Sequence, residues 1–251
     1  MAGPVAPCRL CGNLGELQDS HIIPRWCYER ILNGPEGRQP QAVLIDGRRE
    51  TQSYSNNQLS EYLLCTACEI RCGRWDDYAS RILVQEDLSF PWLDMVPGGA
   101  PDRVVDAGNV DVDAITRFVY SVVWRGSVST VLPASLGDRY EREFAEYLLD
   151  RSEVPPRTCA VVKLLATRSM QRQIIPPQAG RFRSCHRHYF AACGSVFQVY
   201  VGGLIPSVLW SAHFPAERVV IVGDGSDLKK LIAPGIATYR TVGKLAREPG
   251  P

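Results

Sequence analysis

Two pairs of cysteines, each with the spacing Cys-x-x-Cys, constrain this chain more than any other feature. Cys8 and Cys11 form the first pair, Cys65 and Cys68 form the second, and residues 12–64 separate them. Two such pairs supply the four thiolates of a tetrahedral zinc site, with zinc–sulfur distances of about 2.3 Å and no open position for a substrate. We therefore predict a structural Zn²⁺ that joins two distant parts of the chain. The alternative is that these are ordinary buried thiols.

The chain has nine cysteines in total, and clustered thiols in a reducing compartment indicate metal binding rather than disulfides. Cys72 lies one helical turn after the second pair and is interpreted as a core residue or a spare ligand. Cys27 and Cys159 have no partner at metal-binding spacing and are interpreted as small buried hydrophobes. The stretch Cys185–Cys193, which holds two histidines, is a second possible metal cluster, although a basic strand that contacts phosphate or an inert strand is favoured.

The composition is that of a globular chain, with 45% hydrophobic and 22% charged residues, which excludes a wholly disordered or fibrous protein. No apolar run reaches the ~18–20 residues that cross a bilayer. The N-terminus lacks the charged region and long apolar stretch of a secretory signal. We expect a cytoplasmic protein with no membrane partner, and the sequence leaves its oligomeric state open.

Charge is divided unevenly along the chain, although the formal net charge is only +1. Residues 76–150 carry six basic and fourteen acidic side chains, whereas residues 151–251 carry fourteen basic and five acidic ones. No acid occurs between Glu153 and Glu217, and such a basic stretch indicates a polyanion partner, for which we expect nucleic acid. The alternative is that acidic helices simply pack against a basic sheet. The predicted nucleic-acid contacts are Arg168, Arg172, Arg181, Arg183 and Arg187.

The pattern of apolar, glycine and proline residues predicts an α+β fold in three segments: a zinc-bearing module over 1–90, a helical pair over 91–153, and a basic antiparallel sheet over 154–251. Apolar spacing and capping residues predict the helices, and short β-branched runs between Gly and Pro predict the strands. The expected helices are 25–32, 69–83, one that starts after the N-cap Asp111, and 137–149. The expected strands are 42–45, 159–165, 188–193, 196–201, 208–214 and 219–222. We expect residues 34–60 and 86–110 to be largely loop and connector, and the tail after 240 to be loose.

The stretch Asp19–Pro24, Asp-Ser-His-Ile-Ile-Pro, lies between the two cysteine pairs. Together with the helix predicted after the second pair, this arrangement resembles the zinc-stapled branch of the HNH (ββα-metal) nucleases. The later stretch Phe118–Ser129 is similar to a run found in a largely uncharacterised bacterial HNH-like family. The resemblance covers residues 8–85, extends more weakly over 115–150, and is absent from the C-terminal segment. It implies a ββα-like module that hydrolyses phosphodiester bonds with one divalent metal.

His21 matches the general base of that family, which takes a proton from the attacking water. The residue before this histidine is commonly a metal ligand, but here it is Ser20, and a hydroxyl is a poor ligand for Mg²⁺. After the second cysteine pair stands Glu69, an acceptable oxygen ligand for Mg²⁺ or Mn²⁺. Asp76, seven residues further along the predicted helix, is a second candidate. One metal ligand has therefore moved or been lost.

Three functions remain as hypotheses. The first is a metal-dependent endonuclease with His21 as general base and Glu69 and Asp76 at the catalytic metal. The second is a catalytically inactive, zinc-stapled HNH-like module that binds nucleic acid or protein. The third is a zinc enzyme that acts on a small molecule enclosed by the C-terminal sheet. The sequence favours the first modestly, because likeness of fold is only an indirect argument for function.

Overall fold

A computed structural model describes residues 3–34, 37–38, 42–46, 51–55, 57–83, 103–165 and 173–223. Its elements confirm the predicted α+β class. The described strands are β1 (Val5–Pro7), β2 (Leu14–His21), β3 (Asn33–Gly34), β4 (Gly37–Arg38), β5 (Ala42–Asp46), β6 (Thr51–Ser55), β7 (Ser60–Cys65), β8 (Arg103–Asp106), β9 (Thr158–Leu165), β10 (Ile174–Phe182), β11 (Cys185–Ala192), β12 (Ser195–Val201) and β13 (Val219–Gly223). The described helices are α1 (Arg25–Leu32), α2 (Thr66–Leu83), α3 (Val112–Val128), α4 (Asp138–Leu148), α5 (Ser207–Trp210) and α6 (Phe214–Glu217).

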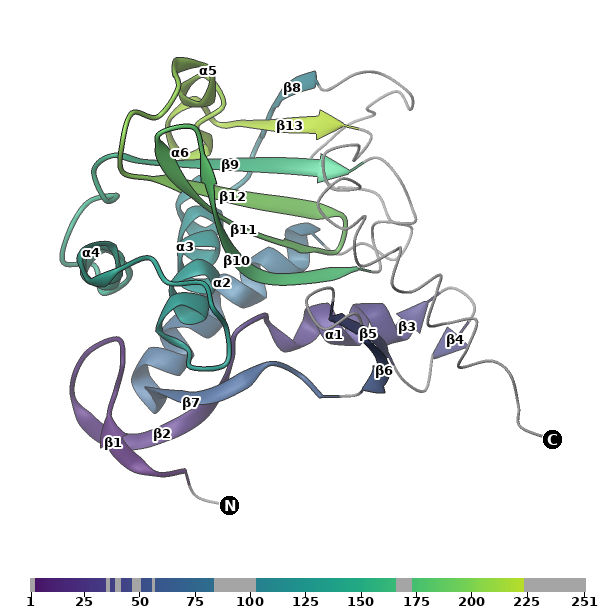
Figure 1. Cartoon of the computed structure of the whole chain (residues 1–251), viewed down its shortest axis with the longest axis vertical. Helices are drawn as coiled ribbons and strands as arrows, with labels where there is room; N and C mark the ends of the chain where they lie inside the picture. The colour runs from purple at the N-terminus through teal and green to yellow at the C-terminus, as the bar shows by residue number, and fades with distance from the viewer. Residues whose placement is uncertain are drawn as a thin grey trace.

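Two sheets lie on opposite sides of a helical layer (Figure 1). The small sheet has the antiparallel order β1-β2-β7, and the large sheet has the order β10-β11-β12-β9-β13-β8. The large sheet is antiparallel except where β13 pairs with β9 in parallel. Helix α2 contacts β2 and β7, helix α3 contacts β10, β11 and β12, and the two helices pack against each other. One continuous hydrophobic core therefore joins residues from all three predicted segments.

Helix α3 is the centre of this core. Its N-cap is Asp111, as predicted, whose carboxylate accepts a hydrogen bond from the backbone N–H of Ala114 at 3.0 Å. Most of its residues are buried, and on the side of the large sheet the Phe118 ring meets the rings of Phe190 and Phe197 at centroid distances of 5.9 Å and 5.5 Å. A helix that is apolar nearly all round must be buried on several sides. The layers on either side of α3 provide that burial.

Most of the predicted elements are present within one to three residues of their expected bounds. The strand predicted at 208–214 is wrong, because this stretch forms α5 and the start of α6. Leu209 and Ala212, three residues apart, face the core together, which is a helical spacing. Pro215 lies in the first turn of α6, where its missing N–H costs nothing.

Within the large sheet, β8 and β10 were not predicted, and both lie at its edges. Strand β10 contains Pro176 and Pro177, which an edge strand tolerates because one row of its amides needs no ladder partner. Its register with β11 shifts between Ile175 and Gln178, at these prolines. Within the described residues, none of the helices combines the length and the apolarity needed to cross a membrane. The predicted loose tail after 240 lies outside the described residues.

Gly126 provides a test of the close contact between α3 and β10. A Cβ atom at this position would lie 2.5 Å from Cβ and 2.7 Å from Cγ of Pro177, and the proline ring has little freedom to move away. We expect Gly126→Ala to lower the free energy of unfolding by about 1–3 kcal/mol through overpacking. The matched control is Gly73→Ala in α2, where an added Cβ meets nothing within 4 Å and should stabilise the helix by up to about 1 kcal/mol. Urea denaturation measures both, and effects of the same sign would contradict the packing argument.

Candidate metal centre and the ββα element

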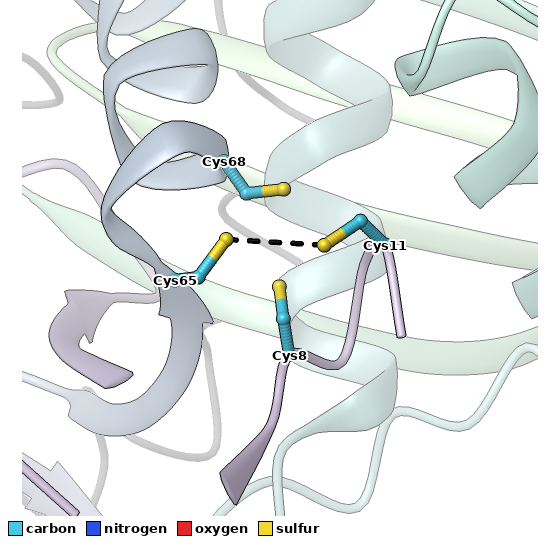
Figure 2. A group of neighbouring side chains, drawn as sticks. All are labelled: Cys8, Cys11, Cys65 and Cys68. Atoms are coloured by element: carbon cyan, nitrogen blue, oxygen red, sulfur yellow. Dashed lines mark hydrogen bonds between the residues drawn. The ribbon is translucent and has the colours of Figure 1, made fainter. Parts of the chain in front are cut away.

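The four predicted zinc ligands come together at one end of the small sheet (Figure 2). The first pair lies in a tight turn, in which the Gly12 N–H donates to the Cys8 carbonyl oxygen at 2.9 Å. Gly12 has φ +77°, a left-handed conformation that glycine adopts without strain. A hydrogen bond of 2.9 Å from the Arg9 N–H to the Leu63 carbonyl oxygen ties this turn to β7. The second pair lies at the junction of β7 and α2.

The sulfur atoms of Cys8, Cys11, Cys65 and Cys68 all lie within 4.8 Å of one another. Cys11 Sγ and Cys65 Sγ are 3.8 Å apart. A tetrahedral ion with metal–sulfur bonds of about 2.3 Å has sulfur–sulfur edges of about 3.8 Å, whereas a disulfide bond is about 2 Å long. The spacing and the all-sulfur donor set therefore fit a structural zinc ion. The prediction that these four residues can hold one metal is confirmed.

Electrostatics distinguish Cys8 of the cluster from Cys72. The hydrogen bond with the Cys68 thiol lowers the pKa of Cys8 to about 4, so the cluster already favours one thiolate. Burial, by contrast, raises the pKa of Cys72 to about 12, and its side chain is only 1% exposed. Cys72 is therefore a neutral core thiol, and it is not part of the four-sulfur group.

The strands β2 and β7 followed by α2 form a ββα element (Figure 1). Ser20 is fully buried and donates a hydrogen bond of 2.6 Å to Glu69 Oε2 on α2. Neighbouring residues on a strand point to opposite faces, so the half-buried His21 ring is directed away from this contact. The His21 imidazole makes no hydrogen bond to any residue in the described ranges.

Asp76 is engaged by Arg125 of α3. Both of its carboxylate oxygens accept hydrogen bonds from the guanidinium group, at 2.9 Å and 3.0 Å. The same guanidinium also donates to the His21 carbonyl oxygen at 2.8 Å and to the backbone and side-chain oxygens of Ser121 at 3.3 Å. These five bonds use all five N–H donors of an arginine. Burial raises the pKa of Asp76, and the charge of Arg125 opposes that shift.

Sequence reasoning missed this network, because Arg125 and Asp76 lie 49 positions apart in the chain. Its side chain is 1% exposed and that of Asp76 is 14% exposed. A buried charge requires compensation by an opposite charge and by hydrogen bonds, and Arg125 has both. His21, Glu69 and Asp76 do not form a metal-holding group in the described part of the chain, where the four cysteines do.

The predicted arginine contacts are divided between described and undescribed positions. Arg168 and Arg172 lie outside the described residues. Arg181 and Arg183 are exposed on the β10–β11 hairpin, and Arg187 is half-buried on β11. In the described ranges none of these three makes an ion pair with an acid.

The second possible metal cluster on β11 does not form among the described residues. His188 is buried, whereas His186 is exposed. Burial lowers the pKa of His188 to about 4, so this imidazole is neutral at physiological pH. Cys185 is fully buried in a separate small core that includes Cys159.

No protein-family model, curated protein or solved structure matches this chain significantly. Functional inference therefore depends on the side chains and their contacts.

We expect the purified protein to contain close to one zinc ion per chain by elemental analysis. Cys65→Ser should lose this zinc and unfold at a lower temperature, because a structural zinc contributes directly to folding. Cys72→Ser is the matched control, since it changes a thiol one helical turn from Cys68 and should keep the zinc. Equal loss of zinc in both variants would contradict the assigned ligand set.

Removing Arg125 should leave a buried and uncompensated carboxylate. We expect Arg125→Leu to lower the free energy of unfolding by about 3–5 kcal/mol, with much of this loss recovered in the double variant Arg125→Leu/Asp76→Leu. Arg139→Ala, which removes an exposed pairing with Glu143, should have a much smaller effect. Chemical denaturation measures all three, and an Arg125→Leu variant as stable as the wild type would show that the network is not needed.

Proposed function

We propose that this protein is a zinc-stapled, HNH-like module that binds nucleic acid without hydrolysing it. The observation that carries the proposal is the bidentate hydrogen bonding of Asp76 to Arg125. A carboxylate with both oxygens committed to a buried guanidinium is not available to a catalytic metal. An aspartate is a suitable metal ligand, but Asp76 is bound to Arg125 and has a structural role.

The remaining donors around this position also favour binding without catalysis. Mg²⁺ prefers carboxylates and water, and the ligand position before the histidine is occupied by the hydroxyl of Ser20. That hydroxyl donates to Glu69, so one of the Glu69 oxygens is already hydrogen-bonded. At this position the ββα element offers a divalent ion the carboxylate of Glu69, one oxygen of which is already hydrogen-bonded. A nuclease needs several preorganised metal ligands.

The arginines of the β10–β11 hairpin support a nucleic-acid partner. Arg181 and Arg183 are exposed, and no acidic residue occurs between Glu153 and Glu217. Arginines without local acidic partners attract phosphates at long range and pair with them on contact. The zinc would then fix the fold and take no part in chemistry.

A hydrolase is the second candidate, and His21 favours it. Its imidazole is half-buried and free of hydrogen bonds to the described residues, so a ring nitrogen is available to take a proton from an attacking water. Glu69 of α2 contacts Ser20, the residue before His21, and a Mg²⁺ ion can be held by a single carboxylate together with water and substrate phosphates. Such an ion would stabilise the negative charge that develops on the phosphate. The third hypothesis, a zinc enzyme for small molecules, lacks support because a four-cysteine site has no open coordination position.

We expect the zinc-loaded protein to bind labelled oligonucleotides with an affinity that falls steeply with salt, measured by fluorescence anisotropy. Arg181→Gln/Arg183→Gln should reduce the slope of log affinity against log salt by about two, since each phosphate contact contributes about one. Arg139→Gln/Arg142→Gln, on the acidic helix α4, is the matched control and should leave the slope unchanged. The wild type should cleave neither DNA nor RNA with Mg²⁺, Mn²⁺ or Ni²⁺.

Two outcomes would overturn this proposal in different ways. Metal-dependent cleavage that His21→Ala abolishes would establish the hydrolase. Failure of the zinc-loaded protein to bind any oligonucleotide at low salt would exclude a nucleic-acid partner.

A further inference from the structure

The large sheet has an apolar face toward α3 and a mixed outer face, on which Tyr200 joins Cys159 and Val161 in a small buried core beside α5 and polar side chains lie next to it. The face toward α3 is apolar and includes Phe190 and Phe197, which contact Phe118. Residues next to these in sequence point to the other face. There the strand register aligns two rows of side chains across β10, β11 and β12: Gln178, Tyr189 and Gln198 form the first row, and Gly180, Arg187 and Tyr200 form the second.

The side chains in these rows form a network of neighbouring polar groups. Arg187 and Tyr200 are cross-strand partners on β11 and β12, and Tyr200 Oη donates a hydrogen bond to Gln198 Oε1 at 2.8 Å. The guanidinium of Arg187 also lies over the Tyr189 ring, 5.0 Å from its centroid. The carbonyl oxygen of Gln198 is thus fixed by Tyr200, which leaves its amide N–H donors directed elsewhere. The network orients an aromatic ring, a guanidinium and an amide before any ligand is present.

Two observations show that this network is incomplete by itself. The Nε atom of Arg187 is buried and has no hydrogen-bond partner among the described residues, and an unsatisfied buried donor is costly. Beside it in the same row, a Cβ atom added to Gly180 would meet nothing within 4 Å. An unpaired donor next to open space indicates a position for an acceptor group. Gln178, Arg187, Tyr189 and Gln198 are all half-buried, so they retain exposed surface.

We propose that this face of the large sheet, centred on Arg187, Tyr189 and Gln198, binds single-stranded nucleic acid by stacking an unpaired base on the Arg187–Tyr189 pair. The inference rests on the proposed function and deepens it by naming the site and the strandedness of the ligand. Aromatic and guanidinium planes stack on bases that a duplex keeps covered, and amides pair with the exposed base edges. The Nε donor of Arg187 then finds its acceptor on the base or on the adjacent phosphate.

Charge complementarity supports this ligand over a protein partner. The three strands β10, β11 and β12 contain no aspartate or glutamate, and Arg187 lies on the proposed face, whereas Arg181 pairs with His186 on the other face. A strongly anionic strand is therefore attracted to this part of the sheet.

The test compares the affinity of the zinc-loaded protein for a labelled single strand and for a blunt duplex of the same sequence, by fluorescence anisotropy at fixed salt. We expect the single strand to bind more tightly. Tyr189→Leu, which keeps apolar bulk but removes the ring, should weaken single-strand binding about tenfold or more and change duplex binding by less than twofold. Tyr189→Phe should stay within twofold of wild type, and Tyr62→Ala, which removes an exposed tyrosine of the small sheet, should have no effect.

Gly180→Val tests the open space without touching the network. Valine suits a strand, and an added Cβ meets nothing, so this variant should keep its melting temperature and still lose about tenfold in single-strand affinity. Wild-type affinity in both Tyr189→Leu and Gly180→Val, or a preference for duplex, would overturn this inference and leave the proposed function standing. Absence of binding to both oligonucleotides would overturn the proposed function, and this inference with it.

Discussion

A single guanidinium group joins three separate elements of this molecule. Arg125 of α3 donates to Asp76 on α2, to the His21 carbonyl at the end of β2 and to Ser121 within its own helix. In a buried setting each unsatisfied N–H would cost free energy, so the five bonds must form together or the side chain must leave the core. This requirement fixes α3 against the ββα element at one position along its length.

The small sheet is consequently held at both ends. Cys65 pairs with Leu17 near the four-cysteine cluster, whereas Ser60 pairs with His21 at the opposite end, where Arg125 binds. On the same side, Glu61 of β7 accepts hydrogen bonds from Ser129 and Thr130, just after α3 ends. The four-cysteine cluster and the hydrogen-bonded acids thus anchor a sheet of three short strands at its two ends. The position of His21 follows from this rigid frame.

The two proposed properties of the protein belong to different layers. The ββα element contains residue types found at hydrolytic sites, but its acids Asp76 and Glu61 bind residues in or just after α3 and so hold the layers together. The large sheet is buried on one face by α3 and carries an arginine, a tyrosine and amides on the other. A division of this kind lets one part of the chain provide stability and another provide recognition, with α3 as the shared support.

The sequence by itself determined the elements whose signals are local. Cys-x-x-Cys spacing predicted the metal ligands, and the apolar stripe after Asp111 predicted α3, because both patterns depend on residues a few positions apart. Only the tertiary structure decided the role of Asp76, which on α2 looked like a metal ligand until α3 brought Arg125 to it from 49 positions away. The tertiary structure also explains why β10 tolerates two prolines, since only the sheet order shows that β10 is an edge strand. The alignment of Tyr189 with Gln198 likewise depends on the strand register. Spacing along a chain specifies which face a side chain takes, but its partner is set by the packing of distant elements.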